Sequence, residues 1–453
     1  MALVAGLAAA ATGCGRVAPR PGASAAAPAT RDLPWRVLQQ RIQVGGPNGA
    51  LGLVQAQHIF GKAGTAAGAA LVRAGLVRVR IPANLARLGE DGWRHDRFED
   101  GWWMERLRDL GVPFKAVVEL WPRFTDELHA EHAARLVRRA RPDVVIVGNE
   151  LNAAALRPGV DLGSEIDRYL GQYAAIHAAV RATRPETRIQ LYGEAYDGDP
   201  SDPDAVLRRV LYELRRRGLP APDAAGIHVY DHAGVLPTRV AGYRRLLADF
   251  GRRVPVSVEE LGPRQGIIDH WESGRLRQQA ALDPQRYDSR LEELRAAGWL
   301  HEEEHADLVV QQLATATAFA DQAQVFCAID FDAEISHRRG LMSSYYDRAR
   351  PALGAFRFVQ RLLNGVEDRH YVERADGLRR LDVVRRDGLG ASICWRGAGT
   401  AATADGVPLD VPPFTFVCDG LGRLVHEPRQ DGHRIALPPP TTEEAGGGVR
   451  ILV

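Results

Sequence analysis

The sequence of 453 residues is poor in lysine, in cysteine and in net charge. Only Lys62 and Lys115 among the 58 basic residues are lysines, which indicates a compositional bias toward arginine rather than a function. The formal net charge of +1 argues against a nucleic-acid-binding protein, which needs a strong basic field. The shares of hydrophobic (45%) and charged residues (25%) exclude a disordered chain, a collagen and a polytopic membrane protein.

The cysteines are too few and too scattered for a zinc site built on thiolates. They are Cys14, Cys327, Cys394 and Cys418, and no two of them have C-x-x-C spacing. Cys394 and Cys418 both lie in the C-terminal part of the chain. In an exported protein they could form a disulfide, and two separate buried thiols are the alternative. The sequence leaves both open.

The N-terminus carries an apolar run, residues 2–11, that is too short to cross a bilayer as a stable anchor. A run of that length fits the core of a signal peptide. The four residues that end at Cys14 (Ala-Thr-Gly-Cys) resemble a bacterial lipobox, in which the cysteine is lipidated. We therefore predict a lipoprotein-type signal peptide over 1–14 and a flexible tether and lead-in over 15–48. The predicted protein is exported and bacterial, and it is either anchored to the membrane through a lipid on Cys14 or secreted.

Short apolar segments alternate with amphipathic segments eight times over residues 49–365. The apolar segments predict strands at 51–58, 76–82, 112–121, 144–150, 188–195, 224–230, 254–260 and 325–332. The segments between them carry apolar residues at helical spacing, as at 163–184, 204–217, 236–250 and 351–364. This alternation indicates an α/β fold with a parallel sheet, and eight units predict a (β/α)8 TIM barrel. An open doubly wound sheet is the alternative, but the Gly-rich stretch 61–64 is too short for its phosphate loop.

Residues 366–453 differ from the rest, because short alternating runs are separated there by Gly and Asp turns. The runs lie at 377–384, 391–395, 414–418 and 420–425. They predict a small C-terminal antiparallel β domain that is stacked on the end of the barrel. Its predicted role is structural, with carbohydrate binding as the alternative.

Polar side chains gather where several predicted strands end. They are Arg80 on the second strand, Asn149 and Glu150 on the fourth, His228 and Tyr230 on the sixth, and Glu259 and Glu260 on the seventh. In a (β/α)8 barrel the carboxyl ends of all strands meet at one face, where the catalytic groups lie. Carboxylates on the fourth and seventh strands would face one another there. That arrangement suits a reaction that needs one protonated and one ionised carboxyl group.

Five stretches, taken in order, resemble the signatures of clan A glycoside hydrolases. They are Arg80-Ile81-Pro82, VVIVGNELN at 144–152, His228-Val229-Tyr230, PVSVEELG at 255–262, and Gly340-Leu341 with Arg350-Pro351-Ala352. The resemblance covers about residues 49–365, and the added β domain is similar to that of family 39-type members. It implies a TIM-barrel enzyme that cleaves β-linked glycosidic bonds of a polysaccharide or oligosaccharide with retention of configuration. It implies neither a metal nor an organic cofactor. We predict that the enzyme is a monomer.

The resemblance also implies a role for each matching residue. Glu260 would be the nucleophile, and Glu150 would be the general acid/base, enclosed enough for its pKa to rise toward neutral pH. The other matches would bind the substrate or hold the nucleophile in its ionised form: Arg80, Asn149, His228 and Tyr230.

Two departures from the family pattern bear on the site. Glu259 stands where Thr is common, so the seventh strand carries two adjacent glutamates, which strict alternation would turn to opposite faces. We assign the nucleophile to Glu260, which takes the family position before x-Gly, and keep Glu259 as the alternative. The eighth strand lacks the frequent Trp. Trp121 and Phe331 are the candidates to replace it as a sugar platform, with core packing as the alternative for both.

Residues 301–305, His-Glu-Glu-Glu-His, match the H-E-x-x-H pattern of zinc proteases. In that alternative, His301 and His305 would bind zinc and Glu302 would be the base. We predict instead the solvated first turn of a helix, because acidic residues there complement the helix dipole and no third ligand is evident. A carbohydrate-binding barrel without turnover is the other alternative, although binding alone does not require two facing carboxylates.

Overall fold

The structure is a computed structural model. It describes residues 35–44, 50–54, 79–83, 108–109, 113–120, 122, 124–155, 158–196, 205–264, 266–268, 284–328, 339–343, 348–397, 407–408, 417–426, 434–435, 437, 440–442 and 446–453. Cys14, Trp121 and Phe331 lie outside these residues, and so does the side chain of Arg80. The predictions made for these four therefore remain predictions.

Eight parallel strands form a closed barrel, as the sequence predicts. In spatial order they are β1 (Leu51–Val54), β10 (Gln322–Val325), β7 (Val256–Gly262), β6 (Ala224–Tyr230), β5 (Arg188–Tyr196), β4 (Val144–Val147), β3 (Phe114–Val118) and β2 (Val79–Ala83), which closes the ring on β1. Strands β3, β4, β6 and β7 are buried along their whole length. Burial on both faces explains why their sequences are nearly continuous apolar runs.

The eighth strand of the barrel begins earlier than predicted. It is β10 (Gln322–Val325), whereas the apolar pattern predicted 325–332, so that prediction is wrong in position. β10 pairs with β1 and with β7 only over these four residues. The apolar residues 326–328, which favoured the later position, are buried after the strand has ended.

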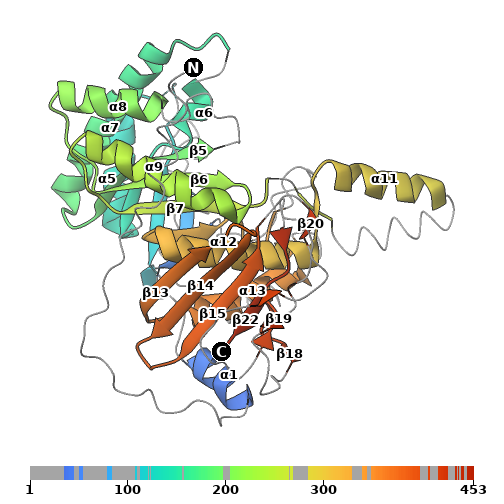
Figure 1. The fold of residues 1–453 in the computed structure, drawn as a ribbon. Coiled ribbons are helices and arrows are strands. Elements are labelled where there is room, and N and C mark those ends of the chain that lie inside the picture. Colours follow the sequence, from blue (N-terminus) through green and yellow to red (C-terminus); the bar gives the residue numbers. More distant parts are fainter. Residues whose placement is uncertain are drawn as a thin grey trace, which may run out of the picture.

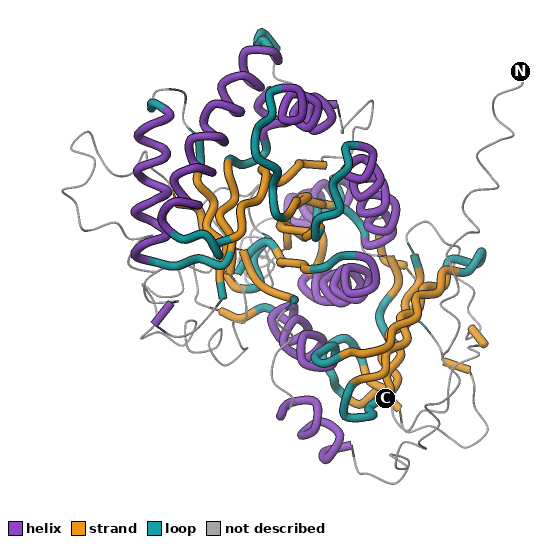
Figure 2. The backbone as a smooth tube through the Cα atoms, turned by 90° about the vertical axis from the view of Figure 1, so that its left-hand side faces the viewer, coloured by secondary structure: helices purple, strands orange, loops and turns teal. Residues whose placement is uncertain are grey.

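Helices surround the barrel strands (Figure 2). The described helices are α1 (Trp35–Val44), α5 (Asp126–Arg139), α6 (Leu151–Ala155), α7 (Leu162–Thr183), α8 (Ala205–Arg216), the 3-10 turn η3 (Ala233–Val235), α9 (Leu236–Asp249), α11 (Pro284–Ala296), α12 (Glu302–Phe319) and α13 (Pro351–Leu362). In α5, the Thr125 hydroxyl accepts a hydrogen bond from the Leu128 amide, and arginines occupy the last turn, where they complement the helix dipole. None of the described helices combines the length and the apolar composition that crossing a bilayer requires.

The connection from β7 to α12 contains a small parallel pair of strands, β8 (Ile267–Ile268) and β9 (Leu300–His301), with α11 between them in the sequence. Figure 1 shows α11 projecting from the side of the molecule. The exposed helix agrees with the acidic and arginine-rich composition of this connection.

A six-stranded antiparallel sheet forms the C-terminal part, as predicted. Its order is β13 (Val366–Glu373), β14 (Leu378–Arg385), β15 (Gly390–Arg396), β22 (Arg450–Leu452), β17 (Val417–Cys418) and β18 (Leu424–His426). Short pairs complete the described strands: β11 (Met342–Ser343) with β12 (Arg348–Ala349), β16 (Val407–Pro408) with β19 (Arg434–Ile435), and β20 (Pro440–Thr442) with β21 (Gly446–Gly447).

The C-terminal sheet packs against the helical side of the barrel, so the predicted stacking on its end is wrong (Figure 1). Phe319 at the end of α12 contacts Tyr371 of β13 edge-on, with ring centroids 4.9 Å apart. The Arg369 guanidinium of β13 donates to the Thr317 carbonyl of α12. Apolar side chains of the barrel and of the sheet belong to one continuous core. Because α12 is buried nearly all round, it is the element that the two parts share.

Cys394 and Cys418 are buried, free thiols, so the structure supports the second of the two alternatives. Strand β22 lies between β15, which carries Cys394, and β17, which carries Cys418. Two strand spacings amount to roughly 9–10 Å, beyond the reach of a disulfide. Burial also raises the pKa of Cys394 to about 12, so this thiol stays protonated.

Candidate active site

A sharp turn after β4 carries Glu150. Gly148 and Glu150 both have a positive φ, 82° and 44°. The positive φ favours glycine at 148, and a Cβ there would also lie 3.3 Å from the side chains of Leu120 and Tyr169. A positive φ is uncommon at a glutamate, and such backbone conformations cluster at functional sites. Just beyond the turn, Asn152 of α6 exchanges two hydrogen bonds with the backbone of Ala195 in β5. These bonds attach the residues that follow the turn to β5.

Strand β6 supplies His228 and Tyr230. The side chain of His228 is fully buried, and Gly193 of β5 provides its space, since a Cβ there would lie 2.1 Å from His228 Nε2. The Tyr230 phenol donates a hydrogen bond to Glu260 Oε2. Burial, helped by the negative Glu260, raises the pKa of Tyr230 well above its usual value. The phenol therefore stays protonated and acts as a donor.

A bulge in β7 turns both glutamates into the barrel. Ile227 of β6 pairs with Val258, but the next residue, His228, pairs with Glu260, so Glu259 is the extra residue. Glu259 is fully buried and pairs with Lys115, whereas Glu260 meets Tyr230. The strict alternation assumed from the sequence is thus wrong at this point, because the bulge adds one residue to the strand.

Glu150, His228 and Glu260 converge at the carboxyl ends of the strands. His228 Nδ1 lies 2.7 Å from Glu150 Oε1 and 3.7 Å from Glu260 Oε2. One ligand atom from each of the three lies within 4.8 Å of the other two. The side chain of Glu150 is 31% exposed and that of Glu260 only 6%, so the expected deeper enclosure of Glu150 is wrong. Among the described residues, this donor set is also the one that could hold a divalent cation.

Two side chains that the sequence did not single out pack on Tyr230. The Phe326 ring, directly after β10, meets it edge-on with centroids 5.4 Å apart, and the peptide bond that follows Phe326 is cis. The Arg339 guanidinium lies 4.8 Å from the centre of the Tyr230 ring. Phe326 is therefore the aromatic residue that the described structure places at the end of the eighth strand. A prediction of the eighth strand at 322–325 would have placed Phe326 at its end.

Gln312 of α12 links the carboxyl ends of β6 and β7. Its amide donates to the carbonyls of Asp231, 2.8 Å away, and Gly262, 3.0 Å away, which follow β6 and end β7. The Gln312 side chain is fully buried. It holds the two strand ends at a fixed separation, and no local sequence pattern indicates this role.

The structure brings together four of the predicted site residues: Glu150, His228, Tyr230 and Glu260. Asn149 precedes Glu150 in the turn and is exposed to solvent. The backbone of Arg80 lies in β2, in register with Val54 of β1.

The His-Glu-Glu-Glu-His run begins α12, as predicted, but its first turn is only partly solvated, with Glu303 exposed. His301 is the N-cap, and its amide donates to Glu304. Glu302 and His305 are fully buried, and Glu302 faces Arg350 at 3.7 Å. The prediction of a solvated turn is therefore wrong for these two residues, because they lie beside Arg350 at the start of α13. In the described part of the chain, the run does not form a group of metal ligands.

We expect His305 to make the protein sensitive to acid. Burial lowers its pKa from 6.5 to about 3, so it is uncharged in the folded protein at pH 4 and gains a proton on unfolding. Because of this residue, the free energy of unfolding should fall by about 1.4 kcal/mol for each unit by which the pH is lowered from 6.5 to about 3. Urea unfolding at pH 4, 5 and 6 should show a shallower pH dependence for His305→Leu than for wild type. The same substitution at the exposed His370 is the control, and equal slopes in all three proteins would contradict the expectation.

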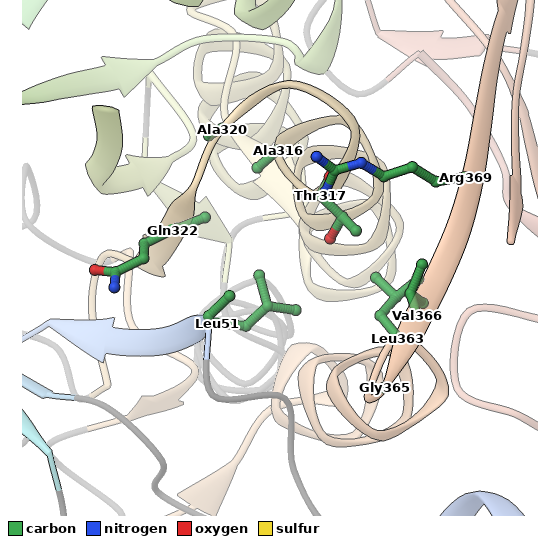
Figure 3. Close-up of a pocket in the computed structure, with 11 residues that line it drawn as sticks. Leu51, Ala316, Thr317, Ala320, Gln322, Leu363, Gly365, Val366 and Arg369 are labelled. Carbon is green, nitrogen blue, oxygen red and sulfur yellow. The ribbon is translucent and has the colours of Figure 1, made fainter. Parts of the chain in front are cut away.

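A cavity of about 170 Å³ lies at the opposite, amino-terminal end of the barrel strands (Figure 3). The starts of β1 and β10, the end of α12 and the start of β13 surround it. Its polar lining residues are Thr317, Gln322 and Arg369. Since no carboxylate is among the described residues that line it, the cavity does not offer the chemistry of the Glu150–Glu260 site.

Glycoside hydrolases of known structure share this fold. A family 39 glycoside hydrolase from the gut symbiont Bacteroides cellulosilyticus WH2 aligns with a TM-score of 0.60 and 14% identity, over 91% of this chain and 82% of its own. A glucosidase from Croceicoccus marinus aligns with a TM-score of 0.54 and 14% identity, over 82% of this chain and 78% of its own. The sequence matches no protein-family model and no curated protein. At this identity the similarity establishes the fold, and the resemblance to clan A barrels is confirmed at that level.

Proposed function

We propose that the protein is a retaining glycoside hydrolase that cleaves β-linked glycosidic bonds of a polysaccharide or oligosaccharide. The observation that carries the proposal is the convergence of Glu150 and Glu260, whose nearest ligand atoms lie within 4.8 Å of each other. Retaining enzymes hold their two carboxyl groups about 5–5.5 Å apart, and inverting enzymes about 6.5–9.5 Å. The fold shared with two glycoside hydrolases supports the same class of reaction.

In the first step, a Glu260 oxygen attacks the anomeric carbon and the glycosidic C–O bond breaks. Glu150 gives its proton to the leaving oxygen, so a neutral hydroxyl departs and a glycosyl ester of Glu260 remains. The Tyr230 phenol binds Glu260 Oε2, and we therefore assign the attack to Oε1. The same hydrogen bond also fixes the orientation of the Glu260 carboxyl group.

In the second step, Glu150 is ionised and takes a proton from a water molecule. The water oxygen attacks the anomeric carbon and releases the Glu260 carboxylate, so that two inversions give net retention. His228 Nδ1, 2.7 Å from Glu150 Oε1, orients the same carboxyl group for both proton transfers. The partial exposure of Glu150 gives it access to the leaving group and to water.

A panel of aryl β-glycosides and β-linked oligosaccharides tests the proposal. Wild type should hydrolyse at least one class and release a product whose anomeric configuration, followed by NMR, is that of the substrate. Glu260→Gln should bind the same substrate without turnover. Binding without hydrolysis by both proteins would instead indicate a carbohydrate-binding barrel.

A chelator distinguishes the carboxylate mechanism from a bound cation at the same three residues. Activity should survive dialysis against EDTA, since neither proposed step requires a metal. Loss of activity that Zn²⁺ restores would mean that Glu150, His228 and Glu260 hold a cation.

We also propose that the protein is exported and anchored through a lipid on Cys14. The support is the apolar run 2–11 followed by the lipobox-like residues and an Ala- and Pro-rich segment. In a bacterial host, Cys14→Ser should move the protein from the membrane fraction to the soluble fraction. Unchanged membrane association of this variant would contradict the anchor.

A further inference from the structure

Lys115 is one of only two lysines in a chain whose other basic residues are all arginine. It lies on β3 with a side chain that is only 2% exposed. With so strong a bias toward arginine, a buried lysine indicates a position that needs the compact ammonium group rather than the broad guanidinium. A buried charge is tolerated only with a partner, so the partner shows what the lysine does.

The Lys115 side chain crosses the interior of the barrel. Its strand, β3, lies opposite β7 in the ring of eight strands. Lys115 Nζ is 2.7 Å from Glu259 Oε1 and 2.9 Å from Ser257 Oγ, both on β7. The Ser257 hydroxyl in turn lies 3.1 Å from the same Glu259 oxygen. The Glu259 carboxylate is thus neutralised by a charge from the far wall of the barrel.

Glu259 is also the extra residue of the β7 bulge, directly before Glu260. Gly226 on the neighbouring strand makes room for it, because a Cβ at Gly226 would lie 2.6 Å from Glu259 Cγ. The bulge is therefore held from two sides, by the ion pair to Lys115 and by the contact with β6. Its geometry sets the direction in which Glu260 points.

We propose that Lys115 is a positioning residue for the nucleophile: by neutralising Glu259 and anchoring the β7 bulge, it keeps Glu260 ionised and directed at the substrate. The inference rests on the proposed function, because it requires Glu260 to act as the nucleophile. A negative charge on the neighbouring side chain would favour the protonated, unreactive form of Glu260. The lysine removes that charge from inside the barrel, where it does not obstruct the substrate.

Other charged or titratable groups also face Glu260, and the test leaves them in place. Among the described residues they are His228 and Tyr230 of β6, Glu150 after β4, and Arg339 beyond the Tyr230 ring. A change at Lys115 leaves Glu259 and Glu260 as adjacent carboxyl groups without the ammonium, and such a pair holds a proton up to a higher pH. Its effect on the ionisation of Glu260 is therefore specific in sign.

The test compares pH profiles of kcat/KM for wild type, Lys115→Met, Glu259→Gln and the double variant Lys115→Met/Glu259→Leu. In Lys115→Met the acidic limb should move up by about one pH unit, with a tenfold loss of kcat/KM on that limb. Glu259→Gln should show no upward shift. The charge-free double variant should return the limb to the wild-type position and recover most of the activity that Lys115→Met loses.

Two results would overturn the inference. One is a double variant whose loss equals the product of the two single losses, as two independent packing defects would give. The other is a Lys115→Met profile that is scaled down without any shift. If Lys115→Met does not fold, the double variant still decides: a folded, active protein with the wild-type limb supports the inference, and an unfolded or shifted one contradicts it. Glu213→Gln, which removes a buried carboxylate on α8 that pairs with Arg216, is the matched control and should leave the profile unchanged.

An infrared titration separates failure of this inference from failure of the proposed function. The carboxyl band that disappears in Glu260→Gln reports the protonation of Glu260 without any substrate. That band should titrate at higher pH in Lys115→Met than in wild type. If the band shifts but no glycoside is hydrolysed, the proposed function fails and the coupling stands; if wild type is active and the band does not move, the inference fails alone.

Discussion

Glu260→Ala is expected to lose hydrolysis of every substrate that wild type cleaves, by about 10⁴-fold or more, because the group that forms the covalent intermediate is gone. Glu150→Ala should behave differently. Its loss should be about 10²–10⁴-fold for poor leaving groups, which need a proton, and much smaller for an activated aryl glycoside. Steady-state kinetics on a paired set of good and poor leaving groups measures the contrast.

Azide provides the control for these roles. A small anion can attack the glycosyl ester of Glu260 without general-base help, so azide should partly restore Glu150→Ala and yield a β-glycosyl azide. Azide should not restore Glu260→Ala in that way, because no ester forms. Reversed behaviour would exchange the two roles. Full activity of Glu260→Ala with loss in Glu259→Ala would move the nucleophile to the extra residue of the bulge.

Gly193→Ala is expected to lower kcat/KM about 10²-fold although residue 193 bears no chemistry. An added Cβ would lie 2.1 Å from His228 Nε2, so the imidazole must leave the position in which its Nδ1 meets Glu150. A displacement of about 1 Å in a positioning group is enough for such a loss. Overpacking of this kind should also lower the free energy of unfolding by about 1–3 kcal/mol.

Gly242→Ala is the matched control for Gly193→Ala. Gly242 lies inside α9, and nothing lies within 4 Å of a Cβ built there. This variant should keep full activity and gain about 0.5–1 kcal/mol, because alanine favours the helix. Two further variants check that Gly193→Ala acts by displacing His228. His228→Ala should lose about as much activity as Gly193→Ala. The double variant Gly193→Ala/His228→Ala should lose no more than His228→Ala alone. Additive losses in the double variant would show that Gly193 acts through something other than His228.

The resemblance and the strand pattern locate the candidate carboxylates without the tertiary structure, for a physical reason. Buried parallel strands are short apolar runs, and catalytic groups in a barrel follow their carboxyl ends. The apolar run of β4 is therefore followed by Asn149 and Glu150, and the run of β7 leads to Glu259 and Glu260. The apolar pattern places the eighth strand too late, because residues 326–328 are buried after the strand has ended. Apolar composition alone does not distinguish these two environments.

The sequence by itself determined the order of strands and helices, the eight-unit barrel and the antiparallel C-terminal part, since these depend on local periodicity. The candidate Glu150–Glu260 pair came from the position of these residues at strand ends and from the resemblance to clan A barrels. Only the tertiary structure decided how the carboxylates are held. The bulge that turns both Glu259 and Glu260 inward adds one residue to β7, and a period of two does not record such an addition. Likewise, Lys115 binds Glu259 from 144 residues away, and the closed barrel brings them to 2.7 Å. A contact of that kind follows from the closure of the sheet, which no local stretch of the sequence contains.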